Sequence, residues 1–150
     1  VEITDFLALL KGKAHQPQLQ QQELVLTADT IVWFENNALC KPKNEVHAIE
    51  MLSKLSGKTH EVISSVCLSS KEKQTCIHET TKVSMAVLLK ADIIHYAKTY
   101  KPLDKAGGYG IQDWIGLIGI SKILGSYTNV LGLPTEKIYQ LLLPYLLPIK

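Results

Sequence analysis

Two runs of sequence decide the fold: HEVISSVCL at residues 60–68 and TCIHETTKVSMAV at residues 75–87. Each alternates apolar and polar side chains well enough, and over enough residues, to predict a long β-strand. The charged stretch Lys71-Glu-Lys73 lies between them and suits a hairpin turn. Because a hairpin makes its two strands antiparallel, a purely parallel sheet is disfavoured.

Outward from these strands, helical and strand patterns alternate along the chain. Asn44 suits a helix N-cap, and apolar residues follow it at helical spacing until Gly57. Asn36-Asn37 suits a second hairpin turn. The expected helices cover residues 3–14, the stretch from Asn44 to Gly57, 90–100 and 134–143, and the expected strands cover 24–34, 38–40, 60–68, 75–87 and 114–120. This order predicts one α/β domain over residues 1–150, with a mixed β-sheet flanked by helices.

Bulk composition narrows the class of protein. The chain has 150 residues, a length typical of one domain with a real core. Its net charge of +2 is too small to indicate binding to nucleic acid or to an anionic membrane. No apolar run approaches the ~20 residues that span a bilayer. The three cysteines, Cys40, Cys67 and Cys76, show no C-x-x-C spacing, so we expect unbridged thiols in the cytoplasm.

The loop Asp104-Lys-Ala-Gly-Gly-Tyr-Gly-Ile-Gln112 is the strongest local indication of a binding site. Glycines let the backbone adopt positive φ and approach a ligand closely. An acid and a base precede them and an amide follows, a mixture that suits a phosphorylated ligand carrying a heterocycle. The loop is neither G-x-G-x-x-G nor a Walker loop, and a plain turn is the alternative interpretation.

Asp29 is a second candidate, because it lies within the otherwise apolar segment Val25-Leu-Thr-Ala-Asp-Thr-Ile-Val-Trp33. A carboxylate there is costly to bury unless it is paired, hydrogen-bonded or metal-bound. The alternative is a turn at the end of a strand, where Asp and Thr bond to nearby backbone groups. The segment itself leaves both interpretations open.

Five motifs in order resemble the Maf family, the septum-formation-inhibitor-like nucleoside triphosphate pyrophosphatases. They are Ala28-Asp-Thr30, Lys41-Pro42, Ser56-Gly-Lys-Thr-His60, the glycine loop, and Gly125-Ser-Tyr-Thr-Asn-Val-Leu-Gly-Leu-Pro134. The resemblance runs from about residue 13 to residue 142. The family's opening Ser-x-Ser-Pro-Arg-Arg segment is not found, and the chain contains no arginine. We therefore expect a family member that is incomplete at its N-terminus.

The resemblance implies an inosine-triphosphatase-like fold and assigns roles to several residues. Asp29 resembles the general base that activates water, and Thr30 matches a position associated with substrate choice. A glutamine at the position of Gln112 is associated in the family with a preference for dTTP and UTP. Three lysines, Lys13, Lys41 and Lys105, are expected to neutralise the triphosphate. Asp104 is expected near a divalent cofactor, Mg²⁺ or Mn²⁺. Thr59-His60 is retained as support for the site.

Two other functions remain open. One is a non-catalytic nucleotide-binding regulator linked to cell division, which the absent arginine segment favours. The other is an α/β phosphatase acting on small phosphate esters, which releases orthophosphate in place of pyrophosphate. The expected partner is a nucleoside triphosphate, with no nucleic acid or membrane, and a homodimer is one expectation because dimers are common in the family.

Overall fold

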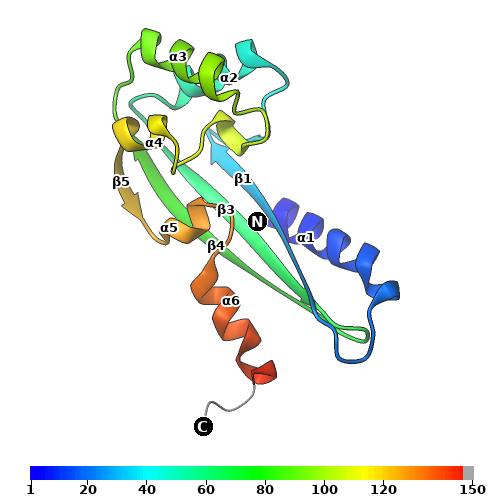
Figure 1. The fold of residues 1–150 in the computed structure, drawn as a ribbon. Coiled ribbons are helices and arrows are strands. Elements are labelled where there is room, and N and C mark those ends of the chain that lie inside the picture. Colours follow the sequence, from blue (N-terminus) through cyan, green and yellow to red (C-terminus); the bar gives the residue numbers. More distant parts are fainter. Residues whose placement is uncertain (147–150) are drawn as a thin grey trace.

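A five-stranded sheet in the order β2-β1-β3-β4-β5 organises the chain (Figure 1). The structure, a computed structural model, describes residues 1–146. The strands are β1 (Val25–Phe34), β2 (Asn37–Leu39), β3 (Thr59–Ser69), β4 (Gln74–Met85) and β5 (Ile120–Leu124). Every pairing among them is antiparallel. The α/β class and the helix-flanked sheet are confirmed, whereas the mixed strand directions that we expected do not occur in the described residues.

Both predicted hairpins form. In the β3–β4 hairpin, the backbone N–H of Ser70 donates to the carbonyl oxygen of Lys73 at 2.8 Å. This register places Cys67 directly opposite Cys76, and both thiols are unbridged. The β1–β2 turn lies at Glu35-Asn36, where φ is 48° and 60°, one residue before the predicted position. Positive φ at both central residues matches the twist of the flanking strands.

The four predicted helices are confirmed, as α1, α2, α3 and α6, and the described residues contain two more. The helices are α1 (Glu2–His15), α2 (Glu45–Leu55), α3 (Lys90–Tyr100), α4 (Trp114–Gly119), α5 (Tyr127–Val130) and α6 (Thr135–Leu142), with short 3₁₀ turns η1 (Gln16–Gln18), η2 (Ala106–Gly108) and η3 (Leu143–Tyr145). The predicted cap is confirmed, because the Asn44 side chain accepts from the backbone N–H of His47 at 2.9 Å. The last helix begins after Pro134, as expected.

The prediction of a buried strand over residues 114–120 was wrong. Residues Trp114–Gly119 form α4, and β5 begins only at Ile120. The backbone N–H groups of Gly116 and Leu117 donate to the carbonyl oxygen of Asp113, which starts a helical turn. Leu117 is 78% exposed, so the run is also not fully buried. A short apolar run has no periodicity that separates a strand from a helix.

The two faces of the sheet receive different helices (Figure 1). Successive side chains of a strand point to opposite faces. On one face, the Ser65 hydroxyl donates to the Asp5 carboxylate of α1 at 2.6 Å. On the other, the Ser64 hydroxyl donates to the carbonyl oxygen of Asn129 in α5 at 3.0 Å. Hydrogen bonds therefore attach a helix to each face.

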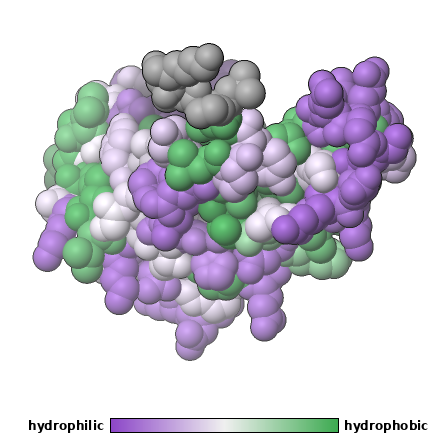
Figure 2. Space-filling view, turned by 90° about the horizontal axis from the view of Figure 1, so that it is seen from below, coloured by the Kyte–Doolittle hydropathy of each residue, from purple (hydrophilic) through white to green (hydrophobic). Residues whose placement is uncertain are grey.

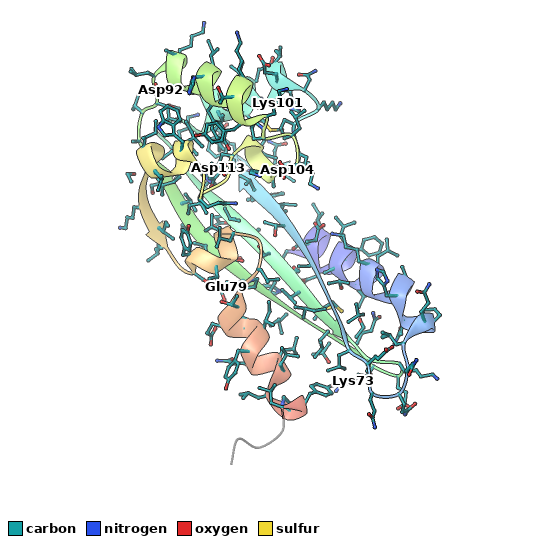
Figure 3. All side chains as sticks on the ribbon, viewed as in Figure 1. Lys73, Glu79, Asp92, Lys101, Asp104 and Asp113 are labelled. Carbon is teal, nitrogen blue, oxygen red and sulfur yellow. The ribbon has the colours of Figure 1, made fainter. Side chains whose placement is uncertain are left out.

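The hydrophobic core occupies one end of the sheet, beneath α2, α3 and α4. Its buried members are Val32, Phe34, Leu52, Leu55, Val62, Val83, Met85, Leu88, Ile93, Tyr96, Tyr109, Ile111 and Ile115. The hairpin tip at Lys73 projects from the opposite end, whereas Asp104 and Asp113 lie in the loop region beside the core (Figure 3). The glycine loop is thus anchored in the core, because its Tyr109 and Ile111 side chains are buried there.

The outer surface mixes hydrophilic and hydrophobic areas on the face seen from below (Figure 2). None of the helices in residues 1–146 combines the length and the apolar character that crossing a membrane requires.

We expect Asn129→Ala to destabilise the fold, because Asn129 attaches α5 to two strands. Its buried amide donates to the carbonyl oxygen of Val62 at 3.1 Å and to the Thr81 hydroxyl at 2.9 Å. Losing both bonds should lower the free energy of unfolding by about 2–3 kcal/mol. Urea unfolding measures this loss. Asn37→Ala removes an exposed amide and should lower the free energy of unfolding by less than about 1 kcal/mol. Equal losses in the two variants would show that the hydrogen bonds of Asn129 do not stabilise the attachment of α5.

Candidate active site

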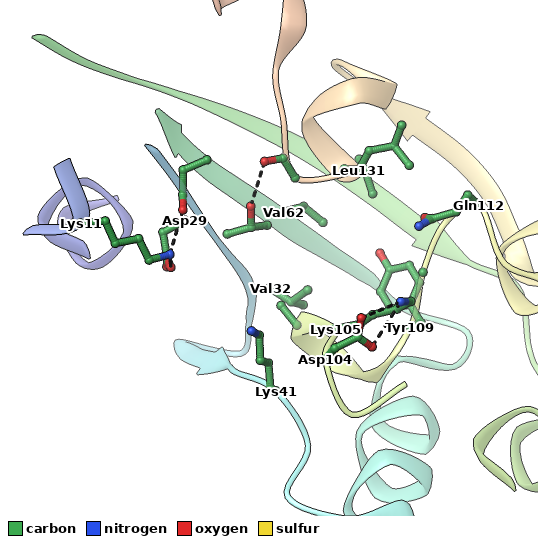
Figure 4. A pocket seen from close by; sticks show the side chains of 16 residues that line it. Lys11, Asp29, Val32, Lys41, Val62, Asp104, Lys105, Tyr109, Gln112 and Leu131 are labelled. Carbon is green, nitrogen blue, oxygen red and sulfur yellow. Dashed lines mark hydrogen bonds and ion pairs between the residues drawn. The ribbon is translucent and has the colours of Figure 1, made fainter. Parts of the chain in front are cut away.

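A cavity of about 410 Å³ lies at the edge of β1 (Figure 4). β2 pairs with β1 only from Val32 to Phe34, so within residues 1–146 the edge of β1 before Val32 has no partner strand. Asp29 and Thr30 point to opposite faces of the sheet, yet both line the cavity. The cavity lies beside the edge of the strand, where side chains from both faces border it.

Asp29 is held by a lysine of α1. The Lys11 ammonium donates to the Asp29 carboxylate at 2.6 Å and to the carbonyl oxygen of Ala28 at 2.8 Å. The Asp29 side chain remains 18% exposed, so it is reachable from the cavity. Asp29 lies within β1, opposite Ser65, so the strand-end turn was the wrong interpretation and the paired carboxylate is the right one.

The structure does not bring Lys13 to this cavity, and Lys11 stands there in its place. The two lysines are two residues apart on α1, which turns their side chains about 200° away from each other. Thr4, Ala8 and Gly12 are the buried positions of α1 and mark the face that contacts the sheet. Lys11 lies close to that face and Lys13 does not. This periodicity of small residues was the signal that could have identified Lys11.

The glycine loop and the Lys41 loop are joined by their backbones. The N–H of Gly107 donates to the carbonyl oxygen of Cys40 at 3.2 Å. Gly107 has φ of 70°, and a Cβ there would lie 2.8 Å from the Val32 side chain. A residue without a side chain is therefore required on both counts. This contact fixes the position of Lys41 relative to the glycine loop.

The charged residues of the cavity are three lysines and two aspartates. The Lys105 ammonium lies 3.1 Å from the Asp104 carboxylate, and this hydrogen bond lowers the pKa of Asp104. Within the described residues, Lys41 is the cavity lysine without a carboxylate partner. The cavity therefore holds an excess of positive charge, which suits an anionic ligand.

Thr30 and Gln112 lie on the wall and at the rim of the cavity. The Thr30 hydroxyl lies 2.8 Å from the Ser64 hydroxyl, and Gly132 adjoins it from the loop after α5. Gln112 is exposed and its amide faces the cavity (Figure 4). Asp29, Thr30, Lys41, Asp104, Lys105 and Gln112 are thus brought together, although they come from three separate stretches of sequence.

His60 and Tyr109 form a buried polar pair beneath the cavity. The His60 Nε2 atom lies 2.7 Å from the Tyr109 hydroxyl, and the two rings meet edge to face at 5.5 Å. Burial lowers the pKa of His60 from 6.5 to about 4 and raises the pKa of Tyr109. Both side chains are therefore neutral near pH 7. Sequence reasoning retained His60 as support and overlooked Tyr109 as a lining side chain.

The donors in the cavity fit a divalent cation that arrives with phosphate. Residues 1–146 contain no group of three or more His, Cys, Asp or Glu side chains placed to hold a metal ion. The Asp29 and Asp104 carboxylates are hard oxygen ligands on two sides of the cavity. Mg²⁺ commonly uses one or two carboxylates and completes its shell with substrate phosphates and water.

Comparison with known proteins now identifies the family. A sequence profile described as Maf-like protein matches residues 1–144. The chain belongs to the Maf-like protein family. A dTTP/UTP pyrophosphatase from Flavobacterium psychrophilum is 56% identical to this Maf-like chain, over 95% of the chain and 73% of the relative. Proteins of the same name from Christiangramia forsetii and Bacteroides fragilis are 51% and 50% identical, over 94% and 93% of the chain and 72% of each relative.

His60 should make the stability of this Maf-like protein depend on pH. The pKa of His60 is about 4 in the folded protein, compared with 6.5 for an unperturbed histidine. Between these values the unfolded chain binds a proton that the folded protein does not, so stability falls as the pH falls. Across this range the free energy of unfolding changes by about 3 kcal/mol, since each pKa unit corresponds to about 1.36 kcal/mol.

Unfolding in urea at pH 7 and at about pH 4.5 measures this dependence. His60→Gln should reduce the change in the free energy of unfolding between the two pH values. His15→Gln removes an exposed histidine and should leave that change as it is. An unchanged slope in His60→Gln would show that other groups carry the effect.

Proposed function

We propose that this chain is a nucleoside triphosphate pyrophosphatase, which hydrolyses dTTP and UTP to the monophosphate and pyrophosphate. The observation that carries the proposal is the Asp29–Lys11 pair on β1 and α1, in a cavity that two more lysines line. Relatives named dTTP/UTP pyrophosphatase support the substrate class. Residues 1–150 would form this catalytic domain, of which residues 147–150 lie outside the described part.

In the proposed reaction, Asp29 accepts a proton from a water molecule that attacks the α-phosphorus. A new P–O bond forms there, the bond to the bridging oxygen breaks, and pyrophosphate leaves. Lys11 contacts the Asp29 carboxylate at 2.6 Å, which holds the carboxylate in place beside the cavity. Lys41 and Lys105 offset charge that develops on the departing phosphates.

We also propose a divalent metal ion as cofactor, which Asp104 would hold together with the phosphates of the nucleotide. Such an ion neutralises phosphate charge when it is bound. Asp104 suits this role because its pKa is lowered, so it is ionised at neutral pH. The unbridged thiols of Cys40, Cys67 and Cys76 support a cytoplasmic site of action.

The identity of the products tests the proposal. The protein, alone and extended by any residues that its gene encodes before Val1, is incubated with a panel of nucleoside triphosphates and Mg²⁺ or Mn²⁺. We expect pyrophosphate from dTTP and UTP. Orthophosphate would indicate a phosphatase of small esters, and binding without any product would indicate a non-catalytic nucleotide-binding protein.

Asp29→Asn should abolish turnover while preserving the fold, because an amide cannot accept the proton from water. The expected loss in kcat is at least about 100-fold. Steady-state pyrophosphate release measures it, with circular dichroism as the check on folding. Asp92→Asn, on α3 outside the cavity, is the matched control and should retain activity. Full activity in Asp29→Asn would refute its role as base.

Gln112→Ala should weaken base preference more than it lowers the rate with a poor substrate. The amide can both donate and accept hydrogen bonds, as a pyrimidine edge requires. We expect the ratio of kcat/KM between UTP and a purine nucleotide to fall about tenfold. Gln18→Ala alters a glutamine far from the cavity and should leave that ratio unchanged. A uniform loss on all nucleotides would assign Gln112 to another part of the substrate.

A further inference from the structure

The His60–Tyr109 pair has one hydrogen bond but two side chains that can each donate. His60 lies on β3 and is 2% exposed, and Tyr109 lies in the glycine loop and is 5% exposed. Their single contact joins His60 Nε2 to the Tyr109 hydroxyl at 2.7 Å. The other ring nitrogen, Nδ1, is buried and has no hydrogen-bond partner in the described residues.

This arrangement selects the tautomer of His60. Because the ring is neutral near pH 7, it carries one N–H, on Nδ1 or on Nε2. A proton on Nδ1 would bury an N–H group with no acceptor, which is among the rarest and costliest defects in a folded protein. A proton on Nε2 has an acceptor at 2.7 Å, the Tyr109 oxygen. The Nε2–H tautomer leaves Nδ1 as a buried acceptor without a donor, which is the less costly defect, so the geometry favours the proton on Nε2.

The tautomer decides what Tyr109 can do. If Nε2–H donates to the Tyr109 oxygen, the hydroxyl proton of Tyr109 is not used by His60. No other acceptor for it lies within hydrogen-bonding distance in residues 1–146. Burial raises the pKa of Tyr109, so the hydroxyl keeps its proton. Tyr109 lines the cavity, and it can offer that proton to a ligand.

We propose that Tyr109 is a specificity-determining donor that recognises a carbonyl oxygen of uracil or thymine, and that His60 is the positioning residue that frees its proton. The inference rests on the proposed function for the substrate class. The Tyr109 ring lies on the Gln112 side of the cavity, across from Lys11 and Asp29 (Figure 4). Val32, Val62 and Leu131 also line the cavity and suit a planar base more than a phosphate.

The chemistry of the bases explains why such a donor discriminates. Uracil and thymine carry two carbonyl oxygens, whereas cytosine has an amino group in place of one of them. A hydroxyl that donates to that oxygen would face a second donor when cytosine is bound. A site built to hydrogen-bond a substrate group rejects analogues that lack it, because its polar atoms are then left unpaired.

The affinities of UMP and CMP test the proposal, since calorimetry of these monophosphates requires no turnover. In Tyr109→Phe, we expect the preference for UMP to fall about tenfold or more, with little change for CMP. Tyr139→Phe, on the exposed surface of α6, should keep the preference. Equal losses for UMP and CMP would place the hydroxyl on the shared phosphate or sugar and overturn the proposal.

Substitutions of His60 separate positioning from packing. His60→Gln retains a donor that can reach the Tyr109 oxygen and should keep most of the UMP preference, whereas His60→Leu cannot donate and should lose it. Equal preference in both variants would overturn the positioning role.

Nitrogen NMR of the imidazole ring in the free protein reads the tautomer directly, and a proton found on Nδ1 would overturn the proposal. If the protein released no pyrophosphate, these binding and NMR results would still decide the role of Tyr109. Retained pyrophosphate release with an unchanged UMP preference in Tyr109→Phe would refute this inference alone.

Discussion

The alternation of side chains along β1 and β3 is the constraint on which the site depends. Asp29 and Ser65 point to the face covered by α1, and Thr30 and Ser64 point to the face covered by α5. A shift of one residue in register would exchange the two sets. The cavity lies beside β1 where, within residues 1–146, β2 does not extend before Val32, and side chains from both faces of the strand line it.

Charge in the cavity is arranged around this edge. Two of its lysines form ion pairs, Lys11 with Asp29 and Lys105 with Asp104. Within the described residues, Lys41 forms no ion pair with a carboxylate and adds a further positive charge. Ammonium groups on flexible stems can follow a phosphate chain without the fixed geometry of a guanidinium. The bond from Gly107 to Cys40 keeps the two loops that carry Lys41 and Lys105 together. The joined loops therefore place two positive charges where both can contact one anionic ligand.

The helix α1 joins the sheet mainly through polar contacts and small residues. Thr27 donates to the carbonyl oxygen of Ala8 at 2.7 Å, and Ser65 bonds to Asp5. At Gly12, a Cβ would lie 2.5 Å from the Ser69 hydroxyl, so the helix approaches the strands closely. This close approach is what allows the Lys11 side chain to reach Asp29 at the edge of β1.

The sequence alone determined the features that local interactions govern. The first four strands with their two hairpins, the Asn44 cap and the bounds of α3 depend on neighbours in the chain. The ordered motifs indicated the family and most of the cavity. Tertiary structure decided the rest. Whether Lys11 or Lys13 reaches Asp29 depends on which face of α1 packs on the sheet, and residues 114–119 became a helix because their short apolar run fits either state. The pairing of His60 with Tyr109 joins positions 49 residues apart, and only packing brings them within a hydrogen bond.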